Sequence, residues 1–185
     1  IHLDGEVLGE IVETLEELEY AGYHFEAADA SLELLMRAAS GWSHDYFTLE
    51  SFSVNVGHRS GSGSRAWNDV AVQVETEATV KVHVGGERVV ATGEGNGPVN
   101  ALDSALRKAL GDRFPELERL HLTDFKVRVL EARQGTGAVT RVLIDTTNGE
   151  RTWTTIGVSE NIIEASWQAL VDSLVFGILH TDDQA

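Results

Sequence analysis

Two segments near the start of the chain carry apolar residues at helical spacing. In 10–20 and 26–39 an apolar residue recurs every three or four positions. These residues are Ile11, Leu15 and Leu18 in the first segment, and Ala28, Leu32, Leu35 and Met36 in the second. Gly22 and Gly41 follow the two patterns, as glycine often follows the last turn of a helix. The pattern predicts two short helices that pack on another part of the protein.

After these helices the apolar pattern changes to alternation, which is typical of half-buried strands. It predicts strands over 47–56, 70–84 and 88–92. Gly85 and Gly86 separate the last two strands and predict a hairpin turn.

A loop and a helix complete this first set of elements. The segment 57–67 is rich in glycine and serine, and we expect it to be a mobile loop. A helix begins at Pro98, a residue that suits a first helical position. Its apolar stripe consists of Val99, Leu102, Leu106 and Leu110.

The same order of elements then recurs. Phe52 and Phe125 occupy equivalent places in two matching strand patterns, at an offset of 125 − 52 = 73 residues. The helical pattern at Ala101 matches the one at Ala165, at an offset of 165 − 101 = 64 residues. The smaller second offset places the extra residues of the first copy in the 57–67 loop. The recurrence predicts two strand–strand–strand–helix units.

These elements predict an α+β protein with two βββα repeats related by a pseudo-twofold axis and preceded by a short helical linker subdomain. We assign the linker to 1–45 and the remaining domain to 46–185. Within that domain, repeat one covers 47–111 and repeat two covers 120–179. Trp153 and Trp167 fall on a strand and a helix of repeat two and are predicted core residues, whereas Trp42 and Trp67 fall in loops.

The charge of the chain narrows the range of partners. Its 30 acidic and 14 basic residues give a net charge of −16, which repels nucleic-acid phosphates and anionic lipid surfaces. We therefore expect no nucleic acid and no membrane as partners, and a cytoplasmic protein. The chain has no cysteine, which excludes disulfides and thiolate metal sites. It begins with Ile1 and not with Met, so we expect a piece of a longer polypeptide.

The glycine run 93–97 is the first candidate for chemistry, because it precedes a predicted helix. A dinucleotide-binding loop would need a glycine where Pro98 stands, and a phosphate-binding loop would need a Lys-Ser or Lys-Thr pair. Two interpretations remain open. The run is either a structural turn into the helix, or a small-ligand site whose backbone N–H groups hold a carboxylate.

The other candidate residues form no catalytic group. No two histidines have the i, i+4 spacing of a helical metal site, and the polar segment 180–183 suggests a solvated tail. The serines at 62 and 64 lack the helix that should follow a nucleophile. We therefore predict that this chain alone is not an enzyme and binds no metal or cofactor.

Three segments resemble a known family. The segments 95–101 and 153–167 resemble the C-terminal regulatory domain of the 2-isopropylmalate synthase and citramalate synthase family, and 22–31 resembles the linker before it. The segments 22–31 and 159–167 are more similar to the citramalate branch. The resemblance implies two βββα units, a homodimer, and a catalytic barrel in the same polypeptide. That barrel would hold a divalent metal and acetyl-CoA and act as an acyltransferase.

The resemblance also implies an amino-acid effector between the two units: isoleucine in the citramalate branch, leucine in the isopropylmalate branch. The effector-binding residues that it implies are Gly95, Gly97, Asn100, Leu122, Phe125, Val129, Thr136, Ala138 and Val158. Feedback inhibition by isoleucine is the favoured interpretation. The alternatives are a leucine-sensing domain and a structural dimerisation module without an effector.

Overall fold

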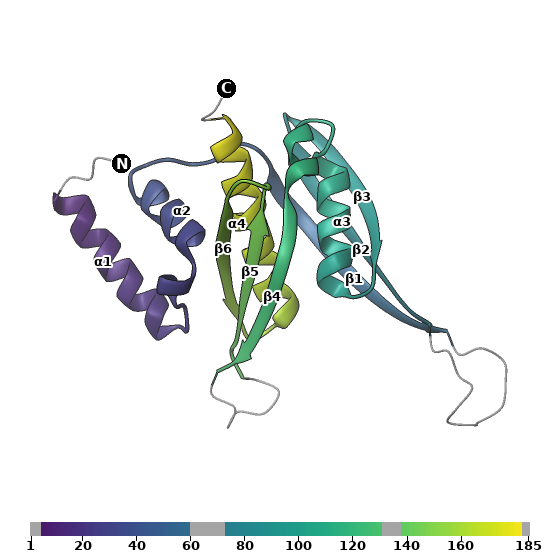
Figure 1. Cartoon of the computed structure of the whole chain (residues 1–185), viewed down its shortest axis with the longest axis horizontal. Coiled ribbons are helices and arrows are strands. Elements are labelled where there is room, and N and C mark those ends of the chain that lie inside the picture. The colour runs from purple at the N-terminus through teal and green to yellow at the C-terminus, as the bar shows by residue number, and fades with distance from the viewer. Residues whose placement is uncertain (1–4, 60–72, 131–137, 183–185) are drawn as a thin grey trace. The chain divides into compact units, whose positions relative to one another are not determined.

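The computed structural model describes residues 5–59, 73–130 and 138–182. The described chain contains two three-stranded antiparallel sheets, each followed by a helix (Figure 1). Repeat one consists of β1 (Thr48–Arg59), β2 (Gln73–Val84), β3 (Glu87–Gly95) and α3 (Pro98–Leu110). Repeat two consists of β4 (His121–Val129), β5 (Thr140–Thr147), β6 (Thr152–Ser159) and α4 (Ile162–Asp182). The helices α1 (Gly5–Tyr20) and α2 (Asp29–Ala39) precede both, which confirms the predicted α+β class.

An irregularity in the strands supports the internal repeat. The pairing of β1 with β2 shifts between Leu49 and Ser51, and the pairing of β4 with β5 shifts between Leu122 and Asp124. Leu49 and Leu122 differ by the 73 residues of the sequence repeat (122 − 49). Because bulges are specific local features of a strand, finding one at the same place supports a true structural repeat.

A close approach between strand and helix also occurs at equivalent places. A Cβ atom added to Gly93 would lie 2.6 Å from the carbonyl oxygen of Ala101, and one added to Gly157 would collide with the carbonyl oxygen of Ala165. Ala101 and Ala165 are completely buried. The glycine on the third strand and the alanine on the helix therefore let the two backbones pack closely in both repeats.

The glycine run differs from the predicted turn. Gly93 and Gly95 belong to β3, which extends beyond the predicted end at residue 92, and only Gly97 lies outside a regular element, as the N-cap of α3. The physical reason is that the missing side chains make room for α3, since a Cβ atom on Gly95 would lie 2.6 Å from the backbone nitrogen of Ala101. The run is therefore mostly strand.

By their contacts, the residues form two compact units. One is Tyr46–Phe114, which contains repeat one, and the other combines Ile1–Asp45 with Pro115–Ala185. The first helices therefore pack with repeat two: Phe25, Ala28 and Ile156 form a buried apolar cluster. This confirms that the helices pack on another part of the chain. The assignment of 1–45 as a separate subdomain and the twofold relation of the repeats stay predictions.

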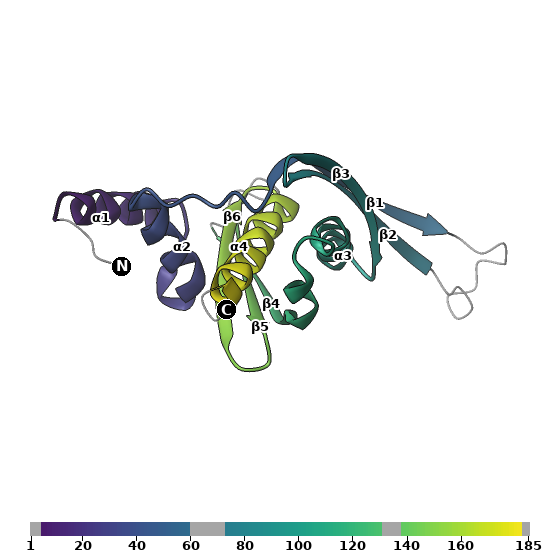
Figure 2. The same ribbon diagram turned by 90° about the horizontal axis from the view of Figure 1, so that it is seen from above.

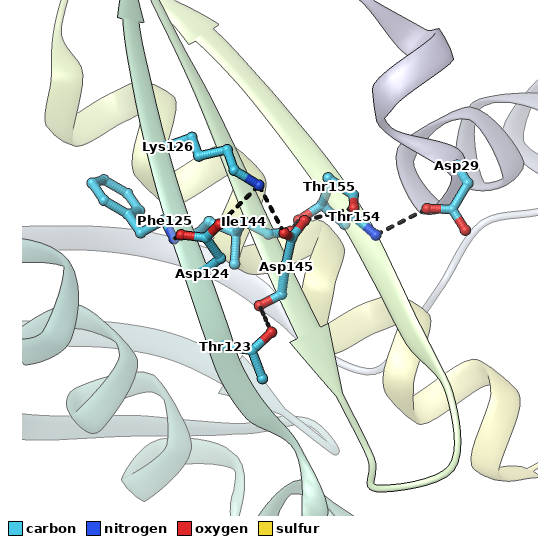
Figure 3. A network of polar contacts seen from close by, with 9 residues as sticks. All are labelled: Asp29, Thr123, Asp124, Phe125, Lys126, Ile144, Asp145, Thr154 and Thr155. Atoms are coloured by element: carbon cyan, nitrogen blue, oxygen red, sulfur yellow. Dashed lines mark hydrogen bonds and ion pairs between the residues drawn. The ribbon is translucent and has the colours of Figure 1, made fainter.

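Side chains from α2 and α4 cover the free edge of β6. Every second amide of an edge strand points away from its sheet and needs a partner. The amide of Thr154 donates to Asp29 Oδ1 (2.9 Å), and that of Ile156 donates to Ser31 Oγ (3.1 Å). The amide of Val158 donates to Gln168 Oε1 (3.0 Å). Figure 3 shows the contact of Thr154 with Asp29.

The helix α4 is the core of its unit. Its segment Ile162–Thr181 has a mean hydropathy of 1.5, enough for a membrane span, but 67% of that segment is buried inside the protein, as expected for a core helix. Trp153 and Trp167 are 3% and 5% exposed, which confirms them as core residues. The predicted solvated tail is wrong for residues 180–182: α4 continues to Asp182, and the ring of His180 contacts that of Phe176 at an interplanar angle of 47°.

Some residues for which predictions were made lie outside the described part of the chain. These are Thr136, Trp67 and the part of the 57–67 loop from residue 60 onward. The mobility of that loop and the position of Thr136 therefore stay predictions.

We expect Gly157→Ala to lower the free energy of unfolding by about 2–3 kcal/mol, because the added methyl group meets backbone atoms that cannot rotate away. Gly9→Ala is the control. Gly9 lies on an exposed face of α1 with no atom within 4 Å of an added Cβ, and this change should stabilise the chain by up to about 1 kcal/mol. Urea unfolding followed by circular dichroism measures both. A Gly157→Ala protein as stable as the original would contradict the packing.

Candidate functional site

The predicted effector-binding residues divide between the two units. Gly95, Gly97 and Asn100 lie in the unit of repeat one. The unit of repeat two contains Leu122, Phe125, Val129, Ala138 and Val158.

Two of the three predicted residues in repeat one line an open cavity with an acidic wall, whereas Gly97 is not among its described lining residues. The cavity measures about 690 Å³, and its lining includes Gly95, Asn100 and the carboxylates of Glu75, Glu77 and Glu94. None of its described lining residues is basic. Three carboxylates oppose the binding of a ligand carboxylate at this place and favour an ammonium group instead. The sequence prediction of a carboxylate held by the glycine run is therefore not supported by the charge around it.

The side-chain amide of Asn100 and the hydroxyl of Thr76 add polar groups to the lining of this cavity. Asn100 Oδ1 accepts a hydrogen bond from the backbone nitrogen of Asn96 (3.2 Å), which fixes the start of α3. Thr76, which pairs with Gly95 across the β2–β3 ladder, is 2% exposed. Its hydroxyl oxygen has no hydrogen-bond partner among the described residues. An unsatisfied buried hydroxyl is uncommon and costs stability, so it marks a place where a ligand could supply the missing bond.

The residues on β4 form an uncovered apolar face. Phe125, Val127 and Val129 alternate along the strand, and 41%, 41% and 55% of their surfaces are exposed. The helix α4 packs mainly on β5 and β6, which leaves this side of β4 open within the unit. Exposed apolar residues grouped on an edge strand are typical of a surface that another chain covers.

The other side of β4 is polar. Lys126 Nζ lies 2.8 Å from Asp124 Oδ2 and 3.0 Å from Asp145 Oδ2. Thr154 donates to the second oxygen of Asp145 (2.6 Å). Figure 3 shows this network crossing the sheet from β4 to β6, with the ring of Phe125 directed away from it. The sheet therefore separates a charged face from the apolar face of β4.

The two remaining predicted residues are part of the protein's packing. Val158 packs against the cluster of Phe25 and Ile156, so the helices before the repeats cover it. Ala138 is 5% exposed and belongs to the core. For these two residues the structure favours the packing role over contact with an effector.

A second cavity lies in the unit of repeat two and was not predicted from the sequence. It measures about 680 Å³ and lies where α2 faces α4, with lining residues that include Tyr23, Phe25, Trp42, Trp167 and Asp172. Asp172 Oδ2 accepts a hydrogen bond from Ser31 (2.6 Å), and burial raises the pKa of its carboxyl group to about 6. The only sequence signal was a single aspartate in the apolar segment 169–179.

Comparison with known proteins identifies the family. Residues 26–176 match the family described as the LeuA allosteric (dimerisation) domain. The chain belongs to this family. The match covers repeat one and all of repeat two except the end of α4, and it confirms the resemblance found in the sequence.

The relatives of this chain include enzymes that are longer than the chain itself. The chain is 52% identical over 177 residues to an (R)-citramalate synthase of Streptomyces coelicolor, covering 95% of this chain and 31% of that protein. It is 48% identical over 168 residues to an (R)-citramalate synthase of Synechocystis sp., covering 91% of this chain and 30% of that protein. A 2-isopropylmalate synthase of Pseudoalteromonas atlantica is 33% identical over 113 residues, which cover 60% of this chain and 20% of that protein. The LeuA domain thus spans about a third of the length of the relatives it matches.

The raised pKa of Asp172 predicts a pH-dependent stability of the LeuA domain. Its ordinary pKa is 3.8, so between about pH 4 and 6 the folded state binds this proton more tightly than the unfolded state. The contribution of Asp172 to stability therefore rises as the pH falls through this range, by up to about 1.4 kcal/mol per pH unit.

The measurement compares Asp172→Asn with the original chain by urea unfolding at pH 7 and pH 4.5. The asparagine stays neutral. We therefore expect the free energy of unfolding of the variant, relative to that of the original chain, to be about 1–2 kcal/mol lower at pH 4.5 than at pH 7. Asp112→Asn, at an exposed position, is the control for the loss of one negative charge. An equal difference at both pH values for Asp172→Asn would contradict the raised pKa.

Proposed function

We propose that this chain is the regulatory part of an (R)-citramalate synthase, in which isoleucine binds and inhibits the enzyme. The observation that carries the proposal is the 52% identity to an (R)-citramalate synthase over 95% of the chain. The 2-isopropylmalate synthase of Pseudoalteromonas atlantica matches less of the chain at lower identity, which favours isoleucine over leucine.

The parent polypeptide would condense acetyl-CoA with pyruvate in a catalytic barrel outside this chain. Its divalent metal and acetyl-CoA would be bound there. Regulation requires that isoleucine bind the inhibited state of the enzyme more tightly than the active state, since a ligand shifts an equilibrium only by its difference in affinity. In this proposal the chain supplies the binding energy and the barrel supplies the chemistry.

The cavity beside α3 is the proposed place for the polar end of the effector. The carboxylates of Glu75, Glu77 and Glu94 suit the ammonium group of an amino acid, and the hydroxyl of Thr76 suits a further hydrogen bond. Gly97 is the N-cap of α3 and follows Asn96, which lines the cavity; its backbone is extended and no described atom lies within 4 Å of an added Cβ. A side chain at position 97 would therefore fit the fold while occupying the space that a ligand needs.

The uncovered face of β4 supports dimerisation as the second role. Phe125, Val127 and Val129 provide an apolar surface that a second copy of the chain would cover. Light scattering should give a dimer mass for the original chain and a monomer mass for Val127→Asp, which places a charge in the proposed interface. A monomer mass for the original chain at micromolar concentration would contradict this role.

Isothermal titration with isoleucine, leucine and valine tests the effector. We expect isoleucine to bind about 10–200-fold more tightly than valine, because one methylene in an apolar pocket contributes roughly 1–3 kcal/mol. Gly97→Val should remove isoleucine binding and leave the circular dichroism spectrum unchanged. The matched control is Gly9→Val, at another position with no atom within 4 Å of an added Cβ.

Three outcomes would decide between the alternatives. Tighter binding of leucine would indicate the regulation of an isopropylmalate synthase. Binding of none of the three by a folded dimer would indicate a dimerisation module without an effector. Unchanged isoleucine binding by Gly97→Val would exclude the start of α3 as the site.

A further inference from the structure

The cavity between α2 and α4 has no role in the proposed function. Its lining comes from the helices before the repeats, from β6 and from α4, all within one compact unit. In Figures 1 and 2, α2 lies beside β6 and α4. Its volume of about 680 Å³ falls within the range of about 300–1,000 Å³ that small-molecule sites occupy.

The walls of this cavity are mainly apolar and aromatic. Tyr23 and Phe25 stack with 5.5 Å between their ring centroids. Trp42 and Trp167 also line the cavity, together with leucine and valine side chains. Aromatic faces attract cations and bury large apolar groups, so this lining suits a bulky ligand that carries a positive charge.

The charges in the cavity have one sign. Asp172 and Glu164 are the acidic lining residues, and no lysine or arginine is among the described lining residues. His44 also lines the cavity, and burial lowers the pKa of its imidazole, which favours the neutral form. Asp172 is partly buried and accepts a hydrogen bond from Ser31, but it forms no ion pair with a described residue. A partly buried carboxylate without a cation is costly, and an ammonium group placed next to it would relieve that cost.

We propose that this cavity binds an organic ammonium cation with an aromatic or branched apolar body. The ammonium group would pair with Asp172, and the apolar body would lie against the aromatic rings. A free carboxylate on the ligand would face Glu164 and Asp172, and burial disfavours the charged form of His44, the one basic side chain in the described lining. The site therefore disfavours α-amino acids and differs in its chemistry from the effector site.

Three indole compounds of similar shape test the charge preference. Tryptamine carries an ammonium group, tryptophol carries a hydroxyl group, and indole-3-acetate carries a carboxylate. By isothermal titration we expect tryptamine to bind at least tenfold more tightly than tryptophol, and indole-3-acetate to bind least. Equal affinities for the three compounds, or no binding of tryptamine, would overturn the proposal.

Substitutions at three positions test whether tryptamine binds in this cavity. Asp172→Asn keeps the shape of the side chain and should reduce tryptamine affinity to that of tryptophol. Glu118→Gln removes a charge at an exposed position outside the cavity and should leave the affinity unchanged. Ala38→Trp adds bulk from the exposed rim of the cavity and should block tryptamine in a folded protein, which keeps the test valid if Asp172→Asn misfolds. Unchanged affinity in Ala38→Trp would overturn the proposal.

Two further titrations separate this site from the effector site and from a packing surface. Saturating isoleucine and the Gly97→Val change should leave tryptamine affinity unchanged, whether or not isoleucine itself binds. Displacement of tryptamine by isoleucine would overturn the proposal of a separate site. The full-length synthase should bind tryptamine as this chain does. Loss of binding there would show that the rest of the polypeptide fills the cavity, which also overturns the proposal.

Discussion

The free edge of β6 is the constraint on which the unit of repeat two depends. A strand at the edge of a sheet exposes backbone amides that need partners, and uncovered edges lead to unwanted pairing between chains. Asp29 and Ser31 stand two residues apart at the start of α2, and they bond the amides of Thr154 and Ile156, which also stand two residues apart. This match holds α2 on the sheet.

The position of α2 has consequences for the rest of the unit. Ser31 bonds both Ile156 and Asp172, so the same hydroxyl connects the strand, α2 and α4. The cavity exists because α2 is held beside α4 at this point, and Val158 is covered for the same reason. The helices before the repeats thus pack on repeat two. The unit Tyr46–Phe114, which contains repeat one, has no helix before β1 among its described residues.

The sequence predicted those features that local spacing determines. The βββα repeat could be recognised because alanine and leucine recur on both helices at a constant offset, and the structure adds Gly93 and Gly157 as the matching contacts on the strands. The cavity could not be predicted, since Ser31 and Asp172 are 141 residues apart and only the folded chain brings them together. The glycine run was misjudged because a glycine required for close packing looks the same in a sequence as a glycine required for a turn.

Amide hydrogen exchange measured by NMR tests the central claim that α2 and repeat two form one cooperative unit. We predict that the amides of Thr154 and Ile156 exchange as slowly as those of the β5–β6 ladder, because the bonds to Asp29 and Ser31 open only when the whole unit unfolds. They should lose this protection together with the amides of α2 in a chain that carries Asp29→Ala and Ser31→Ala. Fast exchange at Thr154 and Ile156 in the original chain, with the ladder still protected, would contradict the account.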